Sequence, residues 1–218
     1  MRILELFCGI GGVAQACRQL PGTNSVVAAI DINQQALEVY KANFASPTYA
    51  MEIASIRPET LADFAANLWW MSPPCQPFTR RGRQRDLDDP RTAPLTHLVN
   101  AIAQVKPQYV AIENVVGFES SKAFEFVRKT LVESGYLVTS LQLCGTQFGI
   151  PNLRPRFFVM ASRMSSQRGN LERQAGCGSS EFDQLSRSGE STKKNISNLS
   201  PPVTQAVSYT HLTLPTKA

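Results

Sequence analysis

Short apolar runs alternate with amphipathic stretches of helical period through the first 160 residues, and this alternation most constrains the fold. Strands that alternate with helices along a chain form a mostly parallel sheet covered by helices. We therefore expect a doubly wound, seven-stranded α/β fold of the Rossmann-like kind. The expected strands are 2–7, 26–31, 49–53, 68–72, 109–113, 136–142 and 156–161, and the expected helices are 12–19, 34–44, 59–67, 95–104 and 121–134.

The composition changes beyond about Ser162, where Ser, Gln, Gly, Asn, Arg and Lys replace most large apolar residues. Such a segment buries too little apolar surface to offset the entropy of ordering it. We expect one catalytic domain, residues 1–162, and a disordered polar tail, residues 163–218. Its end, residues 207–218, continues no upstream pattern, and a splice, cloning or assembly artefact is one explanation.

The bulk properties allow several classes of partner and compartment. A net charge of +5 permits an anionic partner such as nucleic acid, although many basic proteins bind none. Five irregularly spaced cysteines and two histidines favour neither a disulfide framework nor a zinc site, so we expect no metal. Glycines and Glu5 interrupt the apolar N-terminal stretch, which argues against a signal peptide. We expect a cytoplasmic protein, with the nucleus as a second location.

A glycine-rich turn follows the first expected strand, at residues 8–12 (Cys-Gly-Ile-Gly-Gly). Glycines between a strand and a helix let a ligand approach the helix N-terminus closely. Asp31 ends the second strand, where a carboxylate could accept hydrogen bonds from ribose hydroxyls. Glu52 has a similar place near the third strand, where it could meet an adenine amino group. These residues predict a nucleotide-like cofactor.

The same turn fits other interpretations. Gly9, Gly11 and Ala14 also satisfy the dinucleotide fingerprint, so an NAD enzyme is an alternative. The glycines could also serve only to shape a tight turn.

Cys75 lies directly after the fourth expected strand, within residues 72–77 (Ser-Pro-Pro-Cys-Gln-Pro). Doubly wound sheets place their active sites at this edge, and the prolines fix the backbone and forbid a helix. We expect a nucleophilic thiol on a stiff loop. The arginine-rich run 80–85 could lower its pKa or hold phosphates, or it could be a solvated basic loop.

Two more polar groups fall at the same expected edge. The fifth strand ends in Glu113-Asn114, which supplies a candidate acid or hydrogen-bond partner for a heterocycle. Arg154 and Arg156 precede the last strand, and in an extended segment their spacing points both guanidinium groups to one face.

Taken together, the glycine turn, Pro-Pro-Cys-Gln, Glu-Asn-Val (113–115) and Gly-Ile-Pro-Asn-Leu-Arg-Pro-Arg (149–156) resemble the successive motifs of the carbon-5 cytosine methyltransferases. The resemblance covers about residues 2–161 and makes the NAD alternative remote. Residues 72–84, followed by Asp89-Pro90-Arg91-Thr92, most resemble the branch that methylates cytosine-38 of aspartate tRNA. DNA-modifying members share much of this loop.

The resemblance implies S-adenosylmethionine as the cofactor and nucleic acid as the partner, with tRNA favoured over DNA. It implies that Cys75 adds to cytosine carbon 6 while Glu113 bonds the ring nitrogen and the exocyclic amine. Arg154 and Arg156 would position the flipped base and nearby phosphates. The implied cofactor-binding residues are Phe7, Gly9, Ile10, Gly11, Gly12, Asp31, Ile32, Glu52, Ile53 and Pro74.

The sequence departs from the family after its last expected strand. Family members continue into a target-recognition domain and a later Gly-Asn-Ser type motif, and we find neither here. We therefore interpret the chain as truncated before the recognition domain. The alternatives are a DNA methyltransferase and a catalytically weak form that only binds cofactor or RNA.

Overall fold

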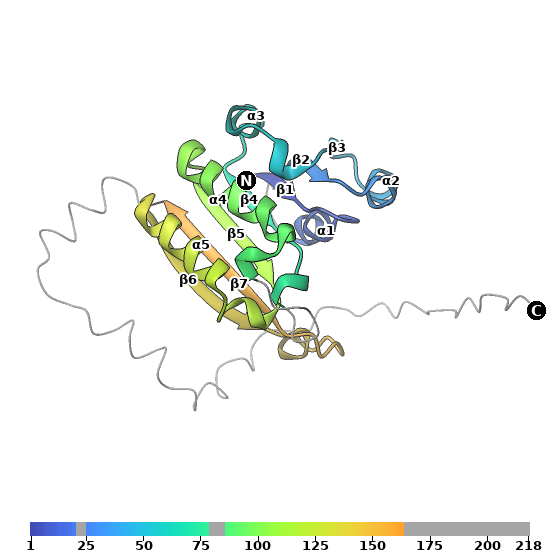
Figure 1. The fold of residues 1–218 in the computed structure, drawn as a ribbon. Helices are drawn as coiled ribbons and strands as arrows, with labels where there is room; N and C mark the ends of the chain where they lie inside the picture. The colour runs from blue at the N-terminus through green and yellow to red at the C-terminus, as the bar shows by residue number, and fades with distance from the viewer. Residues whose placement is uncertain (21–24, 79–85, 164–218) are drawn as a thin grey trace, which may run out of the picture. The chain divides into compact units, whose positions relative to one another are not determined.

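The computed structural model describes residues 1–20, 25–78 and 86–163, which form a seven-stranded sheet with helices (Figure 1). The strand order is β3-β2-β1-β4-β5-β7-β6; β1 to β5 are parallel neighbours, and β7 runs antiparallel to both β5 and β6. The doubly wound, mostly parallel fold is therefore confirmed. The strands are β1 Arg2–Leu6, β2 Ser25–Asp31, β3 Thr48–Ala50, β4 Leu68–Met71, β5 Tyr109–Asn114, β6 Tyr136–Leu143 and β7 Arg156–Arg163.

Five α-helices pack on the sheet and divide its core into two clusters. The larger cluster joins α3, α4 and α5 to one face, and Figure 1 shows α4 and α5 side by side across the strands. The smaller cluster joins α1 and α2 to the other face. The helices are α1 Gly12–Gln19, α2 Gln34–Asn43, α3 Pro58–Asp63, α4 Ala93–Val105 and α5 Lys122–Glu133.

Two elements differ from their expected limits by more than two residues. β3 stops at Ala50, and Ile53 begins the short 3-10 helix η1 (Ile53–Ser55) instead of ending a strand. α3 ends at Asp63, four residues before the expected end. The cause is tertiary: Asn67 pairs with the start of the interior strand β1, where its Oδ1 accepts a 2.9 Å hydrogen bond from the backbone N of Arg2.

The expected tail lies outside the described residues, except that β7 continues through Arg163. The chain divides into the units Met1–Gly169 and Asn170–Ala218, and only the first contains described residues. The basic run 80–85 also lies outside them. Within the described part, no helix is long and apolar enough to cross a membrane.

The face of the sheet that carries α1 and α2 leaves apolar side chains exposed on β5, β6 and β7. Tyr109, Leu137 and Met160 are 39%, 59% and 41% exposed. They line one hollow of about 250 Å³ together with Leu68, which belongs to the smaller core cluster. We call these three side chains and the hollow between them the open face.

Candidate active site

The loop that carries Cys75 is held on both sides of the thiol. The Asn114 side chain, at the end of β5, donates a 3.3 Å hydrogen bond to the carbonyl of Pro73. The backbone N of Phe78 donates to the carbonyl of Cys75 at 2.9 Å, and the Phe78 ring meets Phe118 with centroids 4.9 Å apart. The half-exposed Cys75 thus lies on a fixed loop, as its prolines led us to expect.

Gly117 lets the Cys75 loop approach the chain that follows β5. A Cβ atom at this position would lie 2.4 Å from the carbonyl oxygen of Phe78, which is closer than real Cβ contacts. Only glycine fits without a shift of the backbone. Sequence reasoning missed this residue, because the need for glycine arises from a partner 39 positions away.

Glu113 forms an ion pair with Arg156 beside this loop. Their strands are antiparallel neighbours, and the Arg156 Nε lies 2.9 Å from the Glu113 Oε1. The two side chains are only 17% and 26% exposed, so solvent screens them less than an ordinary surface pair. Asn114 links Glu113 to the segment that precedes Cys75. The expected acid and thiol loop therefore share one sheet edge.

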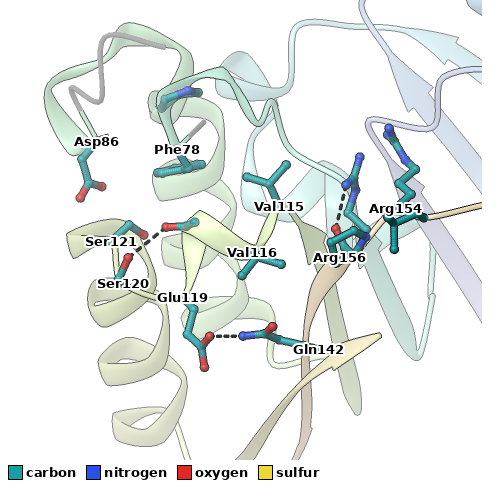
Figure 2. Close-up of a pocket in the computed structure, with 14 residues that line it drawn as sticks. Phe78, Asp86, Val115, Val116, Glu119, Ser120, Ser121, Gln142, Arg154 and Arg156 are labelled. Atoms are coloured by element: carbon teal, nitrogen blue, oxygen red, sulfur yellow. Dashed lines mark hydrogen bonds between the residues drawn. The ribbon is translucent and has the colours of Figure 1, made fainter. Parts of the chain in front are cut away.

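A groove of about 1040 Å³ runs past the loop, between the segment after β5 and the start of β7 (Figure 2). Figure 2 shows Arg154 and Arg156 on one side of this groove and Asp86, Ser120 and Ser121 on the other. Both arginines line it, as their spacing predicted. The Ser120 and Ser121 hydroxyls already donate to the carbonyls of Gly117 and Phe118, so the arginine wall is the part of the groove that can pair with a phosphate.

Asp86, the first described residue after position 78, is held at the N-terminus of α5. Its carboxylate accepts hydrogen bonds from the backbone N of Lys122 at 2.6 Å and of Ala123 at 2.9 Å. These groups are free donors at the N-terminus of α5, and a carboxylate is favoured there by the helix dipole. The sequence gives little sign of a cap that comes from 36 residues upstream.

The glycine turn is fixed by Asp31. One carboxylate oxygen accepts from the backbone N of Gly9 at 2.8 Å, and the other accepts from Asn33 at 2.9 Å. Gly11 has a φ of 97°, and a Cβ there would lie 2.4 Å from the Phe44 ring. The expected ribose-binding acid thus also shapes the turn, because each carboxylate oxygen can accept more than one hydrogen bond.

A buried carboxylate, which sequence reasoning passed over, supports the same turn. Glu5 is 2% exposed and accepts from the Val13 backbone N at 3.2 Å and the Tyr40 hydroxyl at 2.9 Å. Burial raises the pKa of Glu5, against the lowering effect of these hydrogen bonds. Burial, with Glu5 and Asp31 nearby, also raises the pKa of Cys8 to about 12, so Cys8 stays a thiol at neutral pH.

An apolar hollow of about 570 Å³ lies between this turn and Glu113. Its lining extends along the sheet from Met1 and Leu68, at the starts of β1 and β4, to Ser72 and Glu113 at the carboxyl edge, where doubly wound sheets bind cofactors. Of the expected cofactor residues, Phe7, Ile10 and Gly12 line it, and Gly9 and Gly11 shape the turn above it. The other five lie outside its lining: Asp31 bonds Gly9, Ile32 and Glu52 are exposed, Pro74 is half-buried, and Ile53 is 4% exposed in the core.

Comparison with known families gives this arrangement a name. The family model for "C-5 cytosine-specific DNA methylase" matches residues 1–214. The chain belongs to this family. The family match replaces the NAD alternative left open by the glycine turn, and it agrees with the carbon-5 cytosine methyltransferase resemblance.

Several relatives in the family are similar over the described sheet. The tRNA (cytosine(38)-C(5))-methyltransferase of Schizosaccharomyces pombe is 42% identical over 163 residues, which are 74% of this chain and 49% of the relative. The DNA (cytosine-5)-methyltransferase of Dictyostelium discoideum is 39% identical over 168 residues, 75% of this chain and 44% of the relative. The crystal structure of S. pombe Dnmt2 methyltransferase superposes with a TM-score of 0.68 at 36% identity, covering 89% of this chain and 57% of that one. The chain spans about half the length of these curated relatives.

Proposed function

We propose that this chain carries the chemical centre of a methyltransferase that modifies carbon 5 of cytosine in nucleic acid, with cytosine-38 of aspartate tRNA as the preferred target. One observation carries the proposal: a single hydrogen bond, from Asn114 to Pro73, ties the Cys75 loop to the strand end that presents Glu113. Family membership supports the reaction class, and the names of relatives such as the S. pombe tRNA methyltransferase support the tRNA target.

In the proposed reaction the Cys75 thiolate adds to carbon 6 of the cytosine ring. The new C–S bond places electron density on carbon 5, which is otherwise a poor nucleophile, and so divides one difficult step into easier ones. The Glu113 carboxyl bonds the ring nitrogen and the exocyclic amine. Once carbon 5 has formed its bond to the methyl group, a base removes the carbon-5 proton, and Cys75 leaves as the C–S bond breaks.

The apolar hollow and the glycine turn fit S-adenosylmethionine, which when bound supplies the methyl group to carbon 5. Phe7, Ile10 and Gly12 would contact it from the hollow, and Asp31 would accept hydrogen bonds from its ribose. The other family positions, Gly9, Gly11, Ile32, Glu52, Ile53 and Pro74, would complete the pocket from the turn and from neighbouring strand ends.

The two arginines would have different tasks. Arg156 holds one oxygen of Glu113 and so fixes how its carboxyl faces the base. Arg154 is exposed on the groove and forms no ion pair with another described residue, so it is free to pair with a phosphate.

On physical grounds, an RNA loop requires less free energy than a duplex to present the target base. The target base must leave its stack to reach Cys75, and the cost is smaller in an anticodon loop than in a duplex. A tRNA substrate would also suit the expected cytoplasmic location. DNA is the second candidate, and the Dictyostelium relative's name favours it.

Transfer of a labelled methyl group tests the proposal. The purified 218-residue chain is incubated with tritiated S-adenosylmethionine and either aspartate tRNA, the same tRNA with uridine at position 38, or duplex DNA. Of the three substrates, we expect label only on the aspartate tRNA that carries cytosine at position 38. Cys75→Ala should lower transfer by at least about a thousandfold, because it removes the nucleophile. Calorimetry should show that this variant still binds S-adenosylmethionine.

The outcomes separate the alternatives. Label on duplex DNA in preference to tRNA would favour the DNA methyltransferase. Cofactor binding without label on any substrate would favour the alternative in which the chain binds cofactor or RNA but does not transfer a methyl group. Residual transfer by Cys75→Ala would show that another nucleophile acts.

A further inference from the structure

The segment that joins β6 to β7 exposes three large apolar side chains for which the chemistry above has no use. Phe148, Ile150 and Leu153 are 66%, 56% and 84% exposed. Single exposed apolar residues are common on proteins, but three within six positions, the last of which lines the groove, indicate a contact surface.

This segment is a turn that its own hydrogen bonds hold in one conformation. It contains the 3-10 helix η6 (Gly145–Phe148), whose start is closed by a 2.7 Å hydrogen bond from the Cys144 backbone N to the Gln147 side chain. The backbone N of Ile150 returns to the carbonyl of Gly145 at 3.1 Å. Gly145 itself is packed closely, since a Cβ there would lie 3.2 Å from the carbonyl oxygen of Asn152. An ordered turn loses little entropy when it binds a ligand.

The turn continues directly into the candidate active site. β7 begins at Arg156, and its next residue, Phe157, pairs with Asn114 at the end of β5. Leu153 and Arg154 line the groove with Phe78, which belongs to the Cys75 loop. A ligand in the groove would therefore meet this turn next to the target base.

We propose that Phe148, Ile150 and Leu153 form a stacking surface for unpaired bases next to the target cytosine, with Arg154 beside it to pair with a phosphate of the same strand. This inference rests on the proposed function, and it specifies the substrate as single-stranded at the neighbouring positions. Unstacked bases expose flat apolar faces, and proteins bind them with aromatic side chains and guanidinium groups. A duplex keeps those faces covered and offers nothing for the surface to bind.

The polar lining of the groove favours nucleic acid over a protein partner. Arg154 supplies a cation for phosphate, and the Ser120 hydroxyl oxygen and the Gln142 side-chain carbonyl oxygen can accept hydrogen bonds from ribose hydroxyls. Asp86 and Glu119 also line it, but the backbone donors of α5 occupy the first and the Gln142 amide bonds the second.

Binding of a labelled RNA hairpin tests the surface without requiring catalysis. The full chain is titrated, by fluorescence anisotropy, into a hairpin with one cytosine in its loop and, separately, into a fully paired duplex of the same composition. We expect Phe148→Ala to weaken hairpin binding by about tenfold, the effect of losing one stacked base, and to leave duplex binding unchanged. Phe148→Trp should preserve binding, and Leu153→Ser should weaken it by a smaller factor. Val132→Ala, on the exposed side of α5, is the matched control and should have no effect.

Photo-cross-linking locates the contact. A hairpin with 4-thiouridine next to the cytosine should cross-link to a peptide within residues 145–156, and the yield should fall in Phe148→Ala. Hairpin binding that is unchanged in both Phe148→Ala and Leu153→Ser would overturn the proposal, and would leave the surface to a protein partner. Equal losses on hairpin and duplex would also overturn it. Hairpin binding that depends on Phe148, with no methyl transfer, would sink the proposed catalysis and leave the surface standing.

Discussion

At the scale of single residues, Glu5 shows how the cofactor turn is supported from below. It is an acid within an otherwise apolar strand, and it lies 2% exposed beneath α1. Gly11, which precedes that helix, has no side chain to cap it, and the Glu5 carboxylate instead bonds the backbone N of Val13. Tyr40 satisfies the second oxygen. The turn that would hold the cofactor therefore depends on a buried ionisable group.

Glu5→Gln should change how stability depends on pH. The pKa of Glu5 is raised in the folded state above its ordinary value of 4.5, so its contribution is complete below pH 4.5 and declines as pH rises through the raised pKa. We expect the free energy of unfolding of the wild type to fall, relative to Glu5→Gln, across that window. Urea unfolding at a series of pH values measures it. Tyr40→Phe removes a hydrogen bond that lowers this pKa, so it should move the window to higher pH. Parallel curves for wild type and Glu5→Gln would contradict the prediction.

At the scale of elements, the start of α1 offers a matched pair of glycines. Gly11 has a φ of 97° and faces the Phe44 ring, whereas a Cβ on Gly12 would meet nothing within 4 Å. We expect Gly11→Ala to lower the free energy of unfolding by about 2 kcal/mol or more, because the left-handed backbone and the clash add. Gly12→Ala should change it by less than about 1 kcal/mol. Thermal and urea unfolding of both variants measure the difference, and equal losses would argue against the clash.

The same scale shows what could be predicted from the sequence. β2 and β4 match expectation within one residue, because central strands buried on both faces appear as continuous apolar runs. β3 is an edge strand of three residues and has too little pattern to fix its end. The placement of Cys75 and Glu113 at one edge of the sheet was predictable, because the carboxyl ends of parallel strands meet there. The tasks of Asp86 and Gly117 were not, because each depends on a partner more than thirty positions away.

At the scale of the whole described unit, the open face exposes apolar side chains of three strands of the sheet. Its side chains lie on β5, β6 and β7, on the face where α1 and α2 cover only the smaller core cluster. Contiguous exposed apolar surface of this kind binds apolar molecules.

An apolar fluorescent dye should therefore bind the native chain. We expect the fluorescence of anilinonaphthalene sulfonate to increase on binding, and Leu137→Glu to reduce the increase by about half or more, because a charge in the hollow disfavours the dye. Val132→Glu places the same charge at an exposed valine on α5 and should leave the signal unchanged. Equal signals from wild type and Leu137→Glu would show that the open face does not bind the dye.

The two anchors on either side of residues 79–85 have a consequence for how this protein can be altered. Phe78 is held against Gly117 and Phe118, and Asp86 is held at the first turn of α5, which follows them closely in the chain. Both anchors are therefore carried by one short stretch, from Gly117 to Ala123. A substitution that shifts this stretch would move Phe78 and Asp86 together.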